Sequence, residues 1–227
     1  MKLYVSGIEI EIIRKNIKNM HLYVMRPNAK VRITVPSRLS EKRIMDFISS
    51  HIDWIIAKQK EILDEPRALP LNYVNGETLI AFGESYILET IESNRNGLSF
   101  LGSKAILSCK ASATTERREE IVEKALREAL YEKVAPLFEK WEAITGLHAS
   151  SYQIKKMKTR WGTCNTRTKK IWLNLELARK PVECIEYVIL HELIHLCVSN
   201  HGKDFQALMN RYMPLWRDLR KKLNEKI

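Results

Sequence analysis

The chain has 227 residues, of which 45% are hydrophobic and 29% are charged, a composition typical of a folded protein with a substantial core. No run approaches the roughly 18 apolar residues of a membrane span, and the first residues lack the apolar stretch of a signal peptide. We therefore expect no membrane association and a cytoplasmic location. The formal net charge of +11 favours acidic partners, such as nucleic acid, nucleotides or anionic peptides, without choosing among them.

The first third of the chain predicts a small sheet and one helix. Apolar and polar residues alternate over Ile8–Ile12 and Val31–Val35, with turn chemistry at Pro27-Asn28-Ala29 between them. This pattern predicts a small antiparallel sheet with one buried face. Ser40 then caps one helix reaching about residue 63, because apolar residues recur there every three or four positions.

Four short strands follow a proline-containing break at residues 64–70. Alternating segments at residues 78–82, 86–91, 98–101 and 105–109 are separated by turns that contain glycine or asparagine. We expect residues 1–110 to form a β-rich amino-terminal domain with one helix at about 40–63, packed with a second domain of residues 111–227. The whole is predicted to be an α+β fold.

A long helix opens the second domain. It is predicted to begin at Thr114 or Thr115 and to end at Thr145, with Gly146 as its stop. Pro136 removes a backbone donor from the helix interior, so the sequence predicts a kink or break near Lys133.

Residues 152–164 and 171–177 predict two strands of a hairpin placed directly before the last helices. Their basic residues can be the wet face of an edge strand, where charges prevent aggregation. An extended peptide could equally add to that edge by backbone hydrogen bonds. The sequence leaves both interpretations open.

The segment HELIHLCVSNH, residues 191–201, carries the strongest chemical signal. His191 and His195 are four residues apart, so on a helix both imidazoles lie on one face and can bind one metal ion. Glu192 lies beside them, where a carboxylate can take a proton from a metal-activated water. His201 supplies a third ligand, because Asn200 and Gly202 favour the turn that brings it back.

A carboxylate from a later helix is the competing third ligand. The acidic residues downstream of His201 are few, and none is well placed: Asp204, Asp218 and Glu225. The four cysteines have no C-x-x-C spacing, which argues against a cysteine cluster or a disulfide framework and fits a reducing compartment. The sequence therefore favours one zinc ion per chain on three histidines.

Several segments resemble one family, the YgjP-like metallopeptidases, relatives of the SprT and WLM zinc peptidases. They are KTRWGTCN, IWLNLEL, YVILHELIHLCVSNHGKDFQALM and MPLWRDLRKKL, within residues 157–223. The resemblance implies zinc on His191, His195 and His201, Glu192 as general base and a zincin-like fold for the carboxy-terminal domain. It implies no role for Arg160-Trp161-Gly162, and no DNA–protein crosslink function, because no appended DNA-binding module is visible.

The motif and the resemblance together predict a zinc-dependent hydrolase acting on a peptide or protein substrate. Arg160 and Tyr212 are candidates for substrate or transition-state contacts on sequence proximity alone. One alternative is a nucleotide pyrophosphatase that uses the same site on a phosphoanhydride. A further alternative is a basic nucleic-acid-binding module in which the metal site is only structural.

Overall fold

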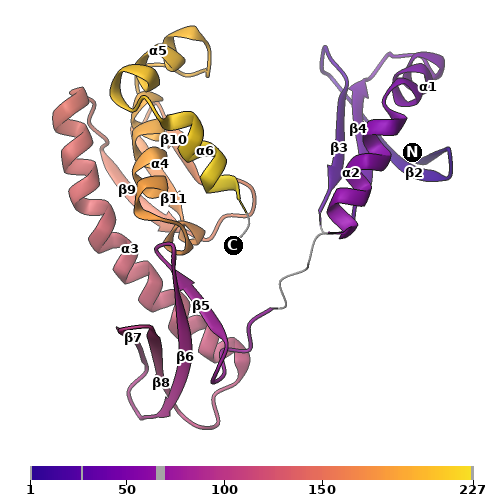
Figure 1. Cartoon of the computed structure of the whole chain (residues 1–227). Helices are drawn as coiled ribbons and strands as arrows, with labels where there is room; N and C mark the ends of the chain where they lie inside the picture. The colour runs from indigo at the N-terminus through magenta and orange to yellow at the C-terminus, as the bar shows by residue number, and fades with distance from the viewer. Residues whose placement is uncertain (1, 27, 65–69, 226–227) are drawn as a thin grey trace. The chain divides into compact units, whose positions relative to one another are not determined.

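The computed structural model describes residues 2–26, 28–64 and 70–225, which divide into two compact units, residues 1–69 and 70–227 (Figure 1). The predicted turn at Pro27 falls partly outside the described residues. No helix among the described residues has the length and apolar character to cross a membrane. Helices and strands are both abundant, which confirms the predicted α+β class.

Unit 1 is a four-stranded sheet with two helices packed on one face. Its strands are β1 (Lys2–Val5), β2 (Ile8–Lys15), β3 (His21–Met25) and β4 (Lys30–Pro36), arranged in the order β1-β2-β4-β3. The central pair β2 and β4 runs parallel, so the prediction of an antiparallel sheet is wrong for that pair. Alternation fixes which face of a strand is buried, but it does not fix the direction of the neighbouring strand.

The single helix predicted at about 40–63 is two helices, α1 (Glu41–Ser50) and α2 (Ile52–Asp64). They meet at His51, whose backbone N–H donates to the Ile48 carbonyl and whose ring Nδ1 lies 2.8 Å from the Phe47 carbonyl. These local bonds tighten the turn and interrupt the regular helix. Ile44, Ile48 and Ile55 still point into the same core, as their spacing predicts.

Unit 2 begins with a second four-stranded sheet of the same topology. The strands β5 (Thr78–Ala81), β6 (Glu84–Glu92), β7 (Gly97–Leu101) and β8 (Lys104–Cys109) follow the order β5-β6-β8-β7, again with a parallel central pair. The structure groups this sheet with the carboxy-terminal elements, whereas we expected the boundary at about residue 110. Its inward side chains share one core with the later helices, and such long-range packing leaves no local signal in the sequence.

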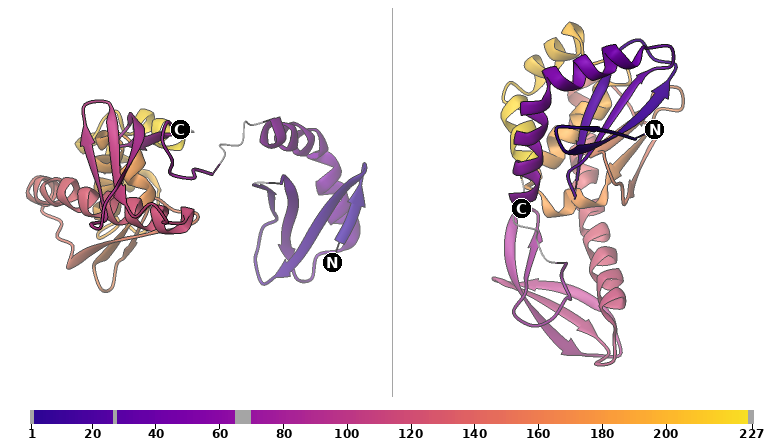
Figure 2. Two further views of the ribbon diagram at one scale, coloured as in Figure 1. Left: turned by 90° about the horizontal axis from the view of Figure 1, so that it is seen from below. Right: turned by 90° about the vertical axis from the view of Figure 1, so that its right-hand side faces the viewer.

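Helix α3 (Thr115–Thr145) runs from this sheet to the layer that carries α4 (Figures 1 and 2). Thr114 caps it by accepting from the Arg117 N–H, and Gly146 ends it in the left-handed region. The predicted break near Lys133 is absent, because the helix continues through Pro136. Buried side chains on both sides of the proline pack into the core, and this packing offsets the roughly 3 kcal/mol cost of an interior proline.

The remaining elements of unit 2 are a three-stranded sheet and four helical segments. The sheet contains β9 (Ser151–Lys155), β10 (Gly162–Asn165) and β11 (Lys170–Asn174) in the order β10-β11-β9. The strand predicted over 152–164 is thus two strands, and only β10 forms the hairpin with β11. The helical segments are η1 (Leu175–Arg179), α4 (Val182–Ile194), α5 (Lys203–Tyr212) and α6 (Trp216–Asn224).

The β5–β6 turn of the first sheet in unit 2 contacts η1 and the start of α4. Phe82 donates its backbone N–H to the Ala178 carbonyl at 2.8 Å. Gly83 has a φ of +86°, and a Cβ built there would lie 2.8 Å from the Pro181 side chain. Only glycine combines this backbone conformation with so close a neighbour.

We therefore expect Gly83→Ala to lower the free energy of unfolding by about 2–4 kcal/mol, through a disfavoured φ and a steric clash. Gly102→Ala is the matched control, because Gly102 also has a positive φ but no neighbour within 4 Å of its Cβ position. It should cost about 1–2 kcal/mol. Urea denaturation followed by tryptophan fluorescence measures both losses of stability. The signal comes mainly from unit 2, because only Trp54 of the five tryptophans lies in residues 1–69. Equal losses would contradict the packing argument.

Candidate active site

The site is built on α4, a helix that is buried on nearly all sides. Val188, Ile189 and Leu190 pack in the core just before His191, and Leu193 and Ile194 follow it. A helix in this environment is held by tertiary packing rather than by a single apolar stripe. His195 stands at the carboxyl end with right-handed helical φ and ψ, so the i, i+4 alignment with His191 is preserved.

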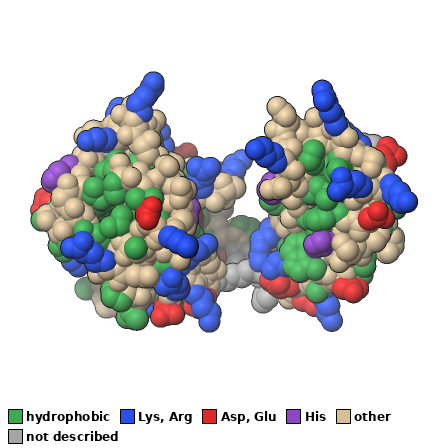
Figure 3. Space-filling model, turned by 90° about the horizontal axis from the view of Figure 1, so that it is seen from above, with side chains coloured by type: hydrophobic (Ala, Val, Ile, Leu, Met, Phe, Trp, Pro, Cys, Tyr) green, Lys and Arg blue, Asp and Glu red, His purple; other side chains and the backbone are tan. Residues whose placement is uncertain are grey.

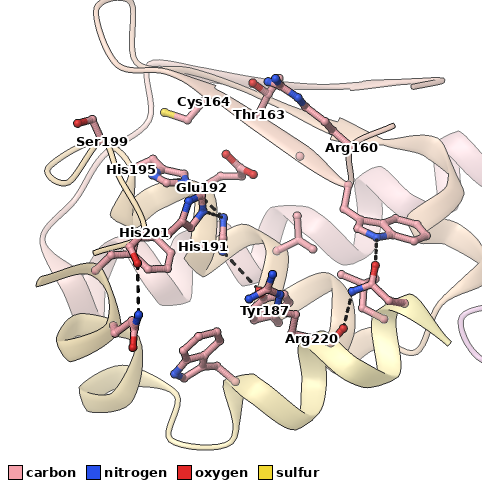
Figure 4. Close-up of a pocket in the computed structure, with 18 of the residues that line it drawn as sticks. Arg160, Thr163, Cys164, Tyr187, His191, Glu192, His195, Ser199, His201 and Arg220 are labelled. Carbon is pink, nitrogen blue, oxygen red and sulfur yellow. Dashed lines mark hydrogen bonds between the residues drawn. The ribbon is translucent and has the colours of Figure 1, made fainter. Parts of the chain in front are cut away.

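Three imidazoles converge at the end of α4. The Nε2 atom of His191 lies 3.2 Å from His195 Nε2 and 3.0 Å from His201 Nε2. His201 reaches this position from the turn after α4, in which Asn200 Oδ1 accepts the Gly202 N–H at 2.9 Å. Figure 4 shows the three side chains pointing toward one another.

The buried ring of Phe205 lies beneath all three imidazoles. Its centroid is 4.8 Å from the rings of His191 and His201 and 5.0 Å from that of His195. Phe205 belongs to α5, so the packing of α5 on α4 brings its ring against the three imidazoles. Phe205 lies in one of the segments that resemble the YgjP-like family, but no motif spacing in the sequence identifies it as a site residue.

Hydrogen bonds orient His191 and His195, and burial favours the neutral form of His191 and His201. His195 Nδ1 lies 2.9 Å from the Val198 carbonyl, so Nδ1 carries the proton and Nε2 keeps its lone pair. The Tyr187 hydroxyl lies 3.5 Å from His191 Nδ1. Burial, followed by the proximity of His195 and His201, lowers the pKa of His191 to about 3, and burial likewise lowers the pKa of His201.

This donor set fits a divalent metal ion. In a tetrahedral zinc site with Zn–N bonds of roughly 2.0–2.1 Å, the ligand nitrogens lie about 3.3 Å apart. The three imidazole ligand atoms here all lie within 4.8 Å of one another. Three lone pairs aimed at one point repel each other unless a cation or proton lies between them, so the cluster is suited to holding a cation.

Glu192 is buried against β10 beside the histidines. Burial raises the pKa of its carboxyl to about 7, although the charge of Arg160 opposes this shift. Gly162 faces it so closely that a Cβ there would lie 2.7 Å from Glu192 Oε1 and 2.8 Å from Cγ. The Glu192 carboxyl group therefore fits in this position because residue 162 has no side chain.

Asn174 holds the segment that leads into β10. Its side-chain amide donates to the carbonyls of Met157 and Arg160, and its Oδ1 accepts the N–H groups of Met157 and Glu176. Its backbone N–H donates to the Trp161 carbonyl at 2.8 Å. One buried side chain thus fixes Arg160-Trp161-Gly162, the segment for which the sequence suggested no role.

A cavity of about 750 Å³ surrounds the histidines and Glu192. Of the two candidates for substrate contacts, Arg160 lines the cavity and Tyr212 does not; the tyrosine in its wall is Tyr187, on α4. The rival carboxylates Asp204, Asp218 and Glu225 are not part of the lining either. Sequence reasoning missed Tyr187, Gly162 and Arg220, of which only Tyr187 had a signal, four residues before His191 on the same helix face.

A comparison with known protein families identifies the family of this chain. The family model described as YgjP-like, metallopeptidase domain, matches residues 18–226. The chain belongs to the YgjP-like family. This confirms the predicted resemblance, and the YgjP-like chain is a metal-dependent hydrolase whose substrates are peptides or proteins.

Two solved structures are similar to part of the YgjP-like chain. The metallopeptidase zymogen abylysin of Pyrococcus abyssi is 21% identical, with a TM-score of 0.38, over 40% of this chain and 90% of that one. The metallopeptidase zymogen jannalysin of Methanocaldococcus jannaschii is 25% identical, with a TM-score of 0.37, over 40% of this chain and 87% of that one. None of the curated proteins matches the chain.

We expect Gly162→Ala to displace the Glu192 carboxyl group, because the added methyl needs space that this carboxyl occupies. The variant should lose about 1–3 kcal/mol of stability by overpacking and at least about tenfold in hydrolase activity. Gly97→Ala is the control, since its Cβ would meet nothing within 4 Å. Urea denaturation and turnover of a peptide substrate measure the two effects. Wild-type values for both in Gly162→Ala would contradict the close contact.

Proposed function

We propose that this protein hydrolyses peptide bonds with one zinc ion held by His191, His195 and His201 and with Glu192 as general base. The observation that carries the proposal is the convergence of the three Nε2 atoms, with His191 at 3.2 and 3.0 Å from its partners. Three protein ligands leave one position of a tetrahedral ion open to water or substrate, which is the arrangement of catalytic rather than structural zinc sites.

The residues around the triad support catalytic use. The Val198 carbonyl and the Tyr187 hydroxyl orient the two histidines of α4 through their Nδ1 atoms, which leaves the Nε2 atoms free to bind the ion. When bound there, zinc polarises a carbonyl group and lowers the pKa of water toward about 7. The neutral state of His191 and His201 means that no proton must leave these two residues before the ion binds.

Glu192 performs the proton transfers in this scheme. A carboxylate oxygen accepts a proton from the attacking water and then delivers it to the leaving nitrogen of the peptide. A pKa raised to about 7 by burial suits both steps, since the group can accept and release a proton near neutral pH. Gly162 positions the carboxyl group and takes no part in the chemistry.

The edge of β10 is the surface along which we place the substrate. β10 pairs with β11 on one side only, and Gly162, Thr163 and Cys164 line the cavity. An extended peptide added to this edge would run past the histidines and bring its carbonyl groups to them. Of the two interpretations that the sequence left open, this position beside the cavity favours peptide addition. Arg160, which lines the cavity and comes shortly before β10, is our candidate for a contact with the peptide.

The nucleotide alternative rests on the same metal site and on the basic character of the chain, and the nucleic-acid alternative rests on the net positive charge. The family match does not support either of them. In the face shown in Figure 3, lysine and arginine side chains are scattered among acidic ones over both units rather than gathered in one stripe. On this face the distribution is typical of a solvated surface.

We expect the wild-type protein to bind about one zinc ion per chain, and His201→Ala to lose at least about 100-fold in zinc affinity, because one of three ligands is removed. Mass spectrometry of metal content after dialysis against zinc measures this. Asp204→Asn is the control and should keep its metal. Loss of metal in Asp204→Asn but not in His201→Ala would assign the third ligand to the carboxylate instead.

Glu192→Gln should lower kcat for peptide hydrolysis by about 10²–10⁴-fold while metal content stays unchanged, because the amide cannot accept the proton. A mixture of casein-derived peptides, with nucleoside triphosphates assayed in parallel, is the substrate panel. Glu176→Gln, which removes a partly exposed carboxylate paired with Arg179 outside the cavity lining, is the control and should retain activity. Wild-type turnover by Glu192→Gln, or phosphate release without peptide cleavage by the wild type, would overturn the proposed mechanism.

A further inference from the structure

Helix α6 forms one wall of the cavity with side chains that the proposed reaction does not use. Trp216, Arg220, Leu223 and Asn224 all line the cavity. Their spacing of four, seven and eight residues from Trp216 places them on one helix face. Trp216 and Leu223 are buried, whereas Arg220 is exposed to the cavity, where Figure 4 shows it beside Tyr187.

This wall is fixed at both ends, so its side chains have defined positions. Trp216 donates its indole N–H to Asn210 Oδ1 at 2.8 Å. Near the other end, Lys222 pairs with Glu183 at 2.6 Å, and the buried Lys180 ammonium donates to the Glu225 carbonyl at 2.5 Å. These bonds tie α6 to α5, to α4 and to the segment before α4.

One hydrogen bond joins the α6 wall to the β10 wall. The Trp161 indole N–H donates to Asn224 Oδ1 at 3.2 Å, and the Asn224 amide donates to the Arg220 carbonyl at 2.7 Å. The Lys180 ammonium lies 5.5 Å from the centre of the Trp161 ring. Trp161 and Asn224 therefore close one side of the cavity. Arg220 lies between this side and the histidines.

The charges in the cavity are unbalanced. Its lining contains two guanidinium groups, Arg160 and Arg220, and one buried carboxyl group, Glu192. Within the described residues, neither guanidinium forms a hydrogen bond or ion pair with an acidic side chain. A bound divalent cation would make the cavity more positive still.

We propose that Arg220 binds a carboxylate of the peptide substrate, so that bonds close to a carboxylate are cleaved preferentially. A guanidinium without a partner in a partly enclosed cavity can form two parallel hydrogen bonds to a carboxylate, and such charge-assisted pairs are stronger than neutral ones. Two sources supply this chemistry: the free carboxyl terminus of a peptide, and an aspartate or glutamate side chain. The inference rests on the proposed peptide hydrolysis and adds a substrate class to it.

Three variants test the assignment. Arg220→Ala removes the group, and Arg220→Lys keeps the charge but loses the planar pair of donors. Lys221→Ala is the matched control, because it removes one positive charge from the same exposed helix outside the cavity lining. Metal content and thermal unfolding of each variant establish that the fold and the triad are unchanged before activity is compared.

The zinc-loaded enzyme is given a synthetic peptide mixture in which each sequence occurs with a free or amidated carboxyl terminus and with glutamate or glutamine at each position. Mass spectrometry identifies the bonds that are cleaved. We expect wild type and Lys221→Ala to prefer carboxylate-bearing members. Arg220→Ala should lose about 10- to 100-fold in kcat/KM on them and little on their neutral counterparts, with Arg220→Lys in between.

The two arms identify the source of the carboxylate. A preference lost on amidation assigns Arg220 to the peptide terminus, and one lost on replacing glutamate by glutamine assigns it to a side chain. Cleavage by wild type without either preference, or the same preference in Arg220→Ala, overturns the assignment and leaves peptide hydrolysis standing. A complete absence of cleavage by the metal-loaded wild type overturns the proposed function itself.

Discussion

The close approach of three imidazoles is the constraint on which the rest of unit 2 depends. The His191 Nε2 atom lies 3.2 and 3.0 Å from its two partners, a spacing at which lone pairs repel unless a cation intervenes. Packing opposes this repulsion, because the Phe205 ring contacts all three side chains and the Val198 carbonyl holds His195. The buried helix α4 provides a rigid base that local loop structure could not.

Two glycines and one asparagine side chain position the elements around the three histidines. Gly83 lets the β5–β6 turn approach Pro181, where α4 begins, and Gly162 lets β10 approach Glu192. Asn174 holds the segment between β9 and β10 through three side-chain hydrogen bonds. Each of these contacts joins elements that are separate in the chain, so the site depends on the assembly of the whole unit.

The two four-stranded sheets show that one topology serves different purposes in this chain. Both follow an antiparallel, parallel, antiparallel order of pairs. In unit 1 the sheet has its own core with α1 and α2, whereas in unit 2 the sheet shares the core of α3 and α4. The second sheet therefore acts as a support for the site, and the first belongs to a separate compact unit.

The sequence by itself determined most elements of regular structure and pointed to His191, His195 and His201, which the structure brings together, and to Glu192 beside them. Periodicity and capping depend on residues close together in the chain, so the bounds of α3 at Thr115 and Thr145, and the strands from residue 78 to 109, could be predicted closely. The i, i+4 spacing of His191 and His195 is likewise a local property that a helix converts into geometry.

Only the tertiary structure decided the direction of the central strands, the unit boundary, the continuity of α3 through Pro136 and the walls of the cavity. Arg220 and Gly162 lie on segments far apart in sequence, and nothing local to either predicts that both face the same cavity. Tyr212, chosen for its nearness in the chain, lies outside the cavity lining, while Tyr187 lies within it. The physical reason is that long-range packing brings side chains together through the combined free energy of many contacts, whereas sequence patterns report only on neighbours along the chain.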